Sequence, residues 1–235
     1  MTFALRAAAI AVGFGVSLHA FAGAQQYEPL SAAVQTQLQR SVSDAAVTQP
    51  AFADDAEAQV WLKVMSDRLK HRMPDEAARR EFLITAHYEA KRAGLDPHLV
   101  LGLIQVESNF RKYAVSSAGA RGFMQVMPFW VKVIGNAEHN LFHLRTSLRY
   151  GCTILRHYLD IEGGDMTRAL ARYNGSLGKQ SDYADKVLSA WRNRWSWDGS
   201  APSRAAAASP PATSPATPPR AKRPAAPMRY LGASG

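Results

Sequence analysis

The sequence predicts an all-α domain with a low-complexity segment at each end. Three observations support this prediction: apolar residues recur at helical spacing through the middle of the chain, capping residues and prolines stand where these repeats begin, and no segment shows the alternation typical of strands. The chain has 235 residues, 47% of them hydrophobic, which suits one average domain with extensions. We predict that this domain spans residues 54–198.

The first two helices are predicted from an apolar face and from end signals. The first carries a set of apolar side chains on one face: Trp61, Leu62, Met65 and Leu69. Pro74 followed by Asp75 opens the second helix, and Gly94 should close it, because glycine readily takes the left-handed conformation found after a helix end.

The third helix is predicted to be the central one. Asp96 is placed to cap it and Pro97 to occupy its first turn. It is the most apolar helix in the chain, with its inward residues at Leu99, Val100, Leu103, Ile104 and Val106. Residues 111–122 are small and polar, so they predict a loop. Further helices are predicted at residues 128–135, 145–160, 165–174 and 180–194.

The first 24 residues are predicted to be a signal peptide. Arg6 precedes an apolar run over residues 7–18, and the small residues at 22–24 form the pattern that signal peptidase recognises. This run is too short for a membrane span, which needs about 20 residues. We therefore expect export to the periplasm, cleavage after Ala24 and no membrane span in the mature chain. The alternative is an uncleaved anchor.

Both ends of the mature chain are predicted to lack stable structure. Residues 25–53 are rich in Ala, Gln and Ser with weak periodicity, which indicates a poorly ordered leader. Residues 199–235 hold eight of the 13 prolines, and such a segment buries too little apolar area to offset the entropy of ordering. This disordered tail has two interpretations: a solubilising linker, or a cationic segment that binds anionic wall polymers or an assembly partner.

Composition excludes several classes of protein. The net charge is +9, but without residues 1–24 and 199–235 only 22 basic and 19 acidic residues remain, so a nucleic-acid-binding face is not expected. Cys152 is the single cysteine, which excludes an intramolecular disulfide and a cysteine-cluster metal site. The seven histidines lack metal-ligand spacing. We predict no metal and no cofactor.

Glu107, near the end of the most apolar helix, is the candidate general acid. Leu103 and Ile104 share its face, and burial beside them would raise its pKa and keep it protonated near neutral pH. The alternative is a glutamate that points into water. Residues 108–137 contain no acid and several cations, which favour the ionised form, so burial would have to outweigh them. A usual glycosidase needs two carboxylates, and no second one lies nearby in sequence.

Four ordered blocks carry a family resemblance. They are ESNF at 107–110, AVSSAGARG at 114–122, FMQVMP at 123–128 and ARYNG at 171–175. Together they resemble the bacterial lytic transglycosylase (SLT) domain, related to goose-type lysozymes, over residues 80–195. The resemblance implies a lysozyme-like all-α domain that cleaves the β-1,4 bond between N-acetylmuramic acid and N-acetylglucosamine in peptidoglycan. One glutamate then serves as acid and base, and the muramoyl 6-hydroxyl attacks to give a 1,6-anhydro product.

The resemblance also implies roles for particular residues. The catalytic acid and base is assigned to Glu107. Substrate-binding roles are assigned to Ser108, Met124, Gln125, Tyr173, Asn174 and Tyr183. From the residues alone, Met124 and Tyr173 could equally be packing residues, and Asn174 could be a helix-terminating residue.

The leading functional hypothesis is a periplasmic peptidoglycan lytic transglycosylase for local wall remodelling. Its partners would be peptidoglycan glycan strands and, by analogy, a secretion, conjugation or pilus assembly; a monomer is expected. Two alternatives stay open: a goose-type lysozyme that hydrolyses the same bond with water, and a non-catalytic wall-binding scaffold with the same fold.

Overall fold

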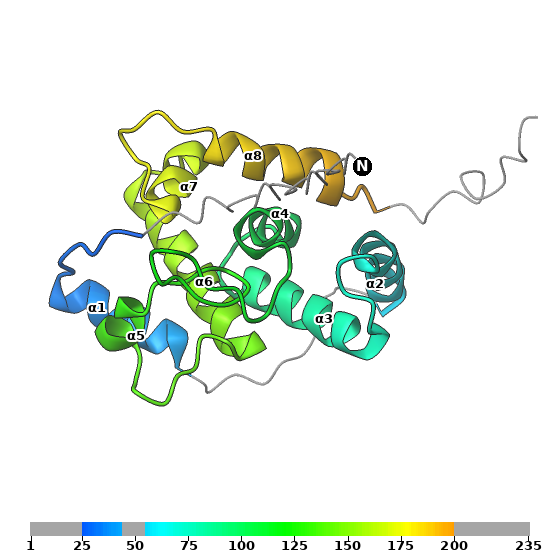
Figure 1. Ribbon diagram of the computed structural model, residues 1–235, viewed down its shortest axis with the longest axis horizontal. Helices are drawn as coiled ribbons and strands as arrows, with labels where there is room; N and C mark the ends of the chain where they lie inside the picture. The colour runs from blue at the N-terminus through cyan, green and yellow to red at the C-terminus, as the bar shows by residue number, and fades with distance from the viewer. Residues whose placement is uncertain (1–24, 44–54, 200–235) are drawn as a thin grey trace, which may run out of the picture. The chain divides into compact units, whose positions relative to one another are not determined.

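The computed structural model describes residues 25–43 and 55–199, and these residues are helical with connecting loops (Figure 1). The elements are α1 (Ala32–Val42), α2 (Asp55–Leu69), α3 (Glu76–Arg92), α4 (Pro97–Ser108), α5 (Phe129–Ile134), α6 (Leu144–Ile161), α7 (Met166–Asn174), α8 (Tyr183–Ala190) and the π-helical turn η1 (Trp191–Trp195). Within the described ranges the β-structure is limited to isolated bridges. The all-α prediction is confirmed.

Helix α4 lies at the centre, as its apolar sequence predicts. It packs against α3, α8 and η1, and Figure 1 shows it end-on between α8 and α3. Leu101, Leu103 and Ile104 are fully buried. Gly102 permits the close approach of the last helical segment, because a Cβ at this position would lie 2.9 Å from the backbone nitrogen of Trp191.

The helix ends follow the capping residues. The Asp75 carboxylate accepts a hydrogen bond from the Ala78 amide at 2.6 Å, and the Asp96 carboxylate accepts one from the His98 amide at 2.7 Å. Gly94, predicted to close α3, has the expected positive φ of 67°. The last predicted helix, over residues 180–194, forms as α8 and η1.

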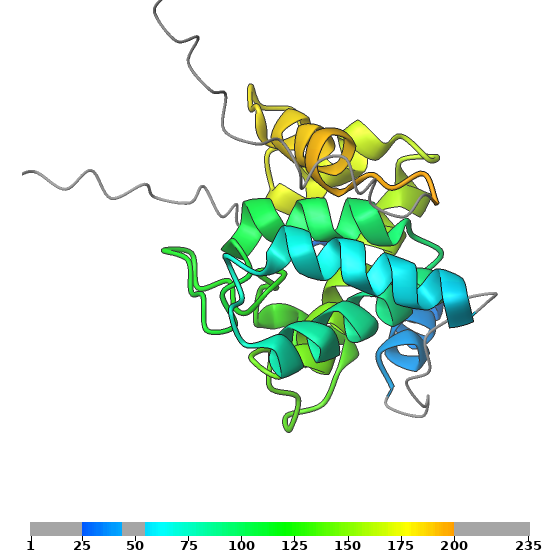
Figure 2. The ribbon, with the colours of Figure 1, turned by 90° about the vertical axis from the view of Figure 1, so that its right-hand side faces the viewer.

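Helix α2 covers the side of α3 and α4, and Figure 2 shows the three helices side by side. Trp61 on α2 is buried, and its indole N–H donates to Nε2 of His98 at 2.8 Å. This hydrogen bond fixes α2 to the first turn of α4.

A buried ion cluster joins α3 to α6. Glu89 on α3 is 1% exposed. Its carboxylate contacts Arg149 at 2.9 Å, Arg92 at 3.1 Å and Arg145 at 3.9 Å. Surrounding guanidinium groups offset the cost of burying this charge.

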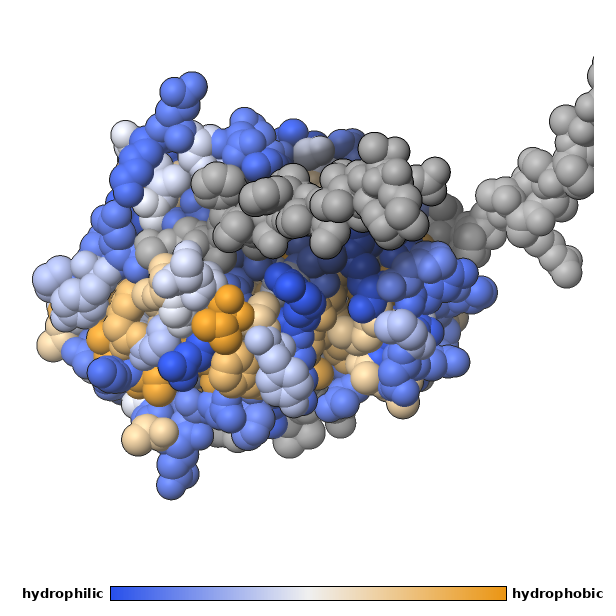
Figure 3. Space-filling model, viewed as in Figure 1, coloured by the Kyte–Doolittle hydropathy of each residue, from blue (hydrophilic) through white to orange (hydrophobic). Residues whose placement is uncertain are grey.

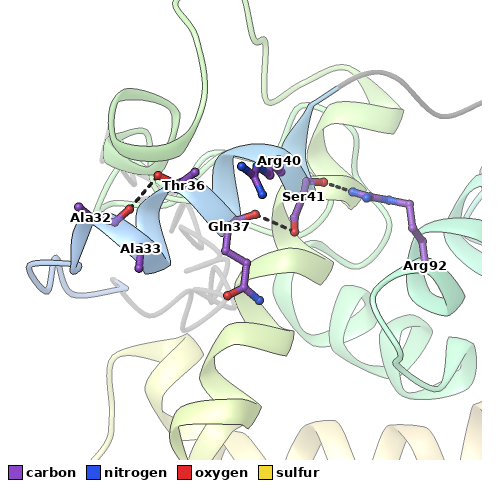
Figure 4. A pocket seen from close by; sticks show the side chains of 7 residues that line it. All are labelled: Ala32, Ala33, Thr36, Gln37, Arg40, Ser41 and Arg92. Atoms are coloured by element: carbon purple, nitrogen blue, oxygen red, sulfur yellow. Dashed lines mark hydrogen bonds between the residues drawn. The ribbon is translucent and has the colours of Figure 1, made fainter.

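Residues 25–43 are ordered, contrary to the predicted leader. Helix α1 packs against α5 and α6. The Gln35 amide donates to the Val133 carbonyl at 2.8 Å. The Arg92 guanidinium donates to the Ser41 carbonyl at the end of α1, beside a surface hollow shown in Figure 4. Cations near a helix carboxyl end stabilise it, and such distant partners are invisible in the local periodicity of α1.

The prediction of a poorly ordered segment is therefore wrong for residues 25–43. The predicted signal peptide, residues 44–53 of the predicted leader and the predicted tail beyond Gly199 lie outside the described residues. Among the described helices, none combines the length and the apolar character required to cross a membrane.

Candidate active site

Glu107 occupies the last turn of α4, against an apolar wall. The helix ends just after it because Asn109 takes a left-handed conformation with φ of 49°. Leu103 and Ile104, one turn earlier, are fully buried, and Glu107 itself is 3% exposed. The local sequence thus carries the carboxyl group into the interior at the point where the helix stops.

Tyr183 is the hydrogen-bond partner of this carboxyl group. It is the first residue of α8, is 4% exposed, and donates its hydroxyl proton to Oε1 of Glu107. Oε2 of Glu107 is buried and has no hydrogen-bond partner among the described residues. A buried polar atom without a partner is costly, so such an atom indicates a place where a ligand group can bind.

Burial controls the ionisation of Glu107. It raises the pKa of the carboxyl group from 4.5 to about 8, and the hydrogen bond from Tyr183 lowers this pKa in part. The nearby cations Arg111, Lys112 and Arg121 are exposed, so burial outweighs them. Glu107 therefore holds a proton at neutral pH, as a general acid must.

The loop after α4 folds back under the carboxyl group. The Gly122 amide donates to the Ala114 carbonyl at 3.0 Å, and the Ser108 hydroxyl donates to the Phe123 carbonyl at 2.7 Å. Gly122 has φ of 78°, and a Cβ there would lie 2.2 Å from the Leu141 carbonyl oxygen. Ser108 thus attaches the loop to the end of α4.

Met124 and Gln125 hold this loop in place with their side chains. Met124 is fully buried and packs against Gly151 on α6. Gln125 is 2% exposed, and its amide donates at 3.0 Å to the carbonyls of both Ala114 and Gly122. Both side chains have internal partners, and their assignment to substrate stays a prediction.

Tyr173, on α7, lies in the interior near Glu107. Its hydroxyl donates to the Met124 carbonyl at 2.7 Å. Burial, followed by the charge of Glu107, raises the pKa of Tyr173 well above its usual value. Asn174, which is 8% exposed, ends α7, where Gly175 takes the left-handed conformation. The structure thus joins Glu107 to Tyr183 and Met124 to Tyr173, and the substrate-binding role of Asn174 stays a prediction.

Sequence reasoning missed Gln25. Its side chain is 3% exposed, and its carbonyl oxygen accepts a hydrogen bond from the Met127 amide at 3.1 Å. A polar residue in a weakly periodic segment carries no signal of burial, because its partners lie about a hundred positions away in the chain.

Exposed apolar side chains lie on the loop that follows α4. Tyr113 is 71% exposed and Val115 is 61% exposed. The ring of Tyr113 lies 5.9 Å from that of Phe142, between centroids. Figure 3 shows that apolar side chains gather over α5 and the neighbouring loops, while the edges of this face are hydrophilic.

Residues 25–43 and 55–199 contain no group of three or more His, Cys, Asp or Glu side chains that could hold a metal ion. Cys152 is fully buried on α6, and burial raises the pKa of its thiol well above the usual value. A buried thiol that keeps its proton is a poor nucleophile.

Comparison with known proteins shows which families the middle of this chain resembles. The sequence model of the transglycosylase SLT domain matches residues 85–195. Membrane-bound lytic murein transglycosylase C of Actinobacillus pleuropneumoniae serotype 5b (strain L20) is 49% identical over 53 residues, which cover 23% of this chain and 14% of that protein. A transglycosylase of Enterobacteria phage PRD1 is 35% identical over 100 residues, which cover 40% of this chain and 37% of that protein.

A solved structure of an inactive mutant of lytic transglycosylase Slt from Pseudomonas aeruginosa is also similar, with 20% identity and a TM-score of 0.41; the match covers 61% of this chain and 37% of that one. This chain thus spans well under half the length of each of these relatives. The matched region, residues 85–195, contains Glu107, Tyr173 and Tyr183, and its limits are close to those of the predicted resemblance. Residues 85–195 thus carry the sequence of a transglycosylase SLT domain.

Proposed function

We propose that the protein is a lytic transglycosylase that cleaves the β-1,4 bond between N-acetylmuramic acid and N-acetylglucosamine in peptidoglycan. The observation that carries the proposal is the state of Glu107: a buried carboxyl group with a pKa of about 8, one oxygen held by Tyr183 and the other without a partner. A group that keeps its proton at neutral pH can protonate a glycosidic oxygen.

In the first step, Glu107 gives its proton to the glycosidic oxygen, and the bond from that oxygen to the anomeric carbon breaks. The carboxylate that remains on Glu107 is stabilised by the Tyr183 hydroxyl, because a hydrogen bond to an ionised acceptor is stronger than one to a neutral acceptor. Tyr183 thus holds the carboxyl group in one orientation in both states.

In the second step, the same carboxylate takes the proton of the muramoyl 6-hydroxyl, whose oxygen bonds to the anomeric carbon. The product is a 1,6-anhydro ring, no water is consumed, and Glu107 regains its proton. One carboxyl group suffices for this cycle. In agreement, among the described residues no second carboxylate contributes to the pKa shift of Glu107.

The substrate places the reaction in the cell envelope, and we propose that the chain acts in the periplasm as an exported protein that remodels the wall locally. The apolar run at residues 7–18 supports export. The basic, proline-rich segment after Gly199 supports an additional contact with anionic wall polymers or with an assembly partner.

Product analysis of digested sacculi tests the proposal. We expect 1,6-anhydro ends from the parent protein, and a loss of activity of about 10²–10⁴-fold in Glu107→Gln, since the amide has no proton to transfer. Glu138→Gln is the matched control, because Glu138 is an exposed glutamate outside the site.

The other outcomes each overturn the proposal in a different way. Reducing ends in place of anhydro ends indicate a lysozyme that uses water. Wall clearing that is unchanged in Glu107→Gln indicates a non-catalytic wall-binding protein.

A further inference from the structure

The N-terminal segment contributes a buried amide to the wall of the site. The Gln25 side chain accepts a hydrogen bond from the Met127 amide at 3.1 Å and donates to the Gln125 carbonyl at 3.4 Å. The carboxamide also lies near the hydroxyl of Tyr173 and lowers the pKa of this phenol in part. With 3% exposure and both ends of the carboxamide engaged, Gln25 is more fully partnered than a residue of a flexible leader would be.

These contacts link Gln25 to Glu107 indirectly, through Tyr173 and the backbone from Met124 to Met127. Tyr173 uses its own proton to bind the Met124 carbonyl, and the Gln25 carboxamide binds the same stretch of backbone at Gln125 and Met127. The backbone from Met124 to Met127 is therefore held from two directions, by a phenol from α7 and by an amide from the start of the described chain. Tyr173 in turn is close enough for the charge of Glu107 to raise its pKa.

The path of this N-terminal segment is fixed by the two residues Tyr27 and Glu28. The ring of Tyr27 meets the ring of Phe129 edge-on at 5.7 Å, and Glu28 pairs with Arg172, the neighbour of Tyr173, at 2.5 Å. In Figure 1 the segment can be followed as the blue thread that leads into α1. Because α1 is anchored separately on α5 and α6, the loss of one carboxamide at residue 25 should leave it in place.

We propose that Gln25 is a positioning residue of the active site. Its carboxamide holds the Gln125–Met127 backbone, and with it the loop that Tyr173 binds at Met124, in a fixed position near Glu107. The inference rests on the proposed lyase activity and deepens it: a residue outside the SLT match sets the geometry of the wall opposite the acid. Without the carboxamide, the Met127 amide and the Gln125 carbonyl lose their partner, and water or a shifted backbone must replace it.

The test uses Gln25→Ala in the full-length exported protein, with Gln26→Ala as the matched control, because Gln26 is an exposed glutamine next in sequence. Intact mass must show the same N-terminus in every variant. We expect turnover on sacculi to fall about tenfold or more in Gln25→Ala, with a melting temperature lowered by only a few degrees, and parent-like turnover and melting temperature in Gln26→Ala. Acetamide, which carries the deleted group, should restore part of the activity of Gln25→Ala and none of that of Glu107→Gln.

A second variant provides a readout that a structural role would not give. Gln25→Glu keeps an acceptor for the Met127 amide but, once ionised, has no proton to donate to the Gln125 carbonyl. As the pH rises and the introduced carboxyl group ionises, the turnover of Gln25→Glu should fall further. Its pH profile should therefore show an extra decline that the profiles of the parent and Gln26→Ala lack.

Three results would overturn the inference. Parent-like turnover in Gln25→Ala means that the carboxamide does not position the site. Faster turnover means that Gln25 obstructs the substrate and must be displaced. A parent protein that releases no anhydro ends overturns the proposed function as well, whereas an active parent with an inactive Glu107→Gln leaves that function intact when Gln25 fails.

Discussion

Two buried glutamates on neighbouring helices have opposite surroundings. Glu89 on α3 is 1% exposed and is surrounded by three guanidinium groups at 2.9–3.9 Å. Glu107 on α4 is 3% exposed, and its hydrogen-bond donor in the described structure is the neutral hydroxyl of Tyr183. Burial costs both carboxylates their hydration, but only Glu89 is compensated by positive charge.

The difference teaches that burial alone does not define a catalytic acid. A buried carboxylate with matched cations serves to join helices, because its charge is already satisfied. A buried carboxyl group without a cation keeps its proton and can transfer it, as the pKa of about 8 for Glu107 indicates. Three experiments can break or sharpen this comparison.

The largest effect is expected for the structural glutamate. Glu89→Gln leaves Arg149, which is 3% exposed, beside a neutral amide, and breaking a buried ion pair in this way costs about 3–5 kcal/mol. Asp67→Asn is the control: it breaks the exposed pair with Lys63, worth about 0–1 kcal/mol. Urea denaturation measures both. If Glu89→Gln lowers the free energy of unfolding no more than Asp67→Asn does, the buried ion cluster does not hold α3 to α6.

The next effect is a stability difference that depends on pH. The folded-state pKa of Glu107, about 8, lies above its ordinary value of 4.5, so between these values the folded protein holds a proton that the unfolded chain has lost. The contribution of Glu107 to the free energy of unfolding is fully present below pH 4.5. It declines as the pH rises and is lost once the pH has passed about 8. Glu107→Gln removes the decline, so its stability relative to the parent should rise by at most about 1.4 kcal/mol per pH unit.

Denaturation curves collected from pH 4 to pH 9 check this expectation. A difference between parent and Glu107→Gln that stays constant over this range would mean that Glu107 ionises at its ordinary pKa, and the comparison with Glu89 would lose its basis.

The smallest effect is expected when the phenol hydroxyl of Tyr183 is removed. Tyr183→Phe removes a hydrogen bond to a group that is charged midway through the reaction, worth about 1.5–3 kcal/mol, so turnover should fall about tenfold or somewhat more. The pKa of Glu107 should rise further, because the hydrogen bond that lowers it is gone. The alkaline limb of the pH profile then moves upward while the rate falls. Tyr88→Phe on α3 is the matched control, and an equal loss there would contradict a specific role for Tyr183.

Much of the fold was predictable because helix ends depend on local contacts. Asp75 and Asp96 bond to amides two or three residues ahead, and Gly94 closes α3 through its own backbone conformation. Such interactions are contained in a few consecutive residues. The position of Glu107 at the end of an apolar helix could be read in the same way. The resemblance to a known family predicted Tyr183 as a substrate-binding residue, and the structure shows that its hydroxyl binds Glu107.

Other features depended on partners far along the chain. Helix α1 carries only a short apolar face, formed by Val34, Leu38 and Val42. Its carboxyl end is held by Arg92 and Arg149 from two other helices. Gln25 looked like part of a loose leader, yet Met127, 102 positions later, binds its side chain. Gln125 resembled a cleft residue, and the fold bonds its amide to its own loop.

The sequence by itself determined where the helices begin, which of them is central, and which glutamate is the candidate acid. Only the tertiary structure decided that this glutamate keeps its proton. The cations that follow it in sequence favour the charged form, and the burial that opposes them comes from α3, α8 and η1, which pack around α4 from distant parts of the chain. Desolvation is a property of everything packed around a group, so no run of neighbouring residues can specify it.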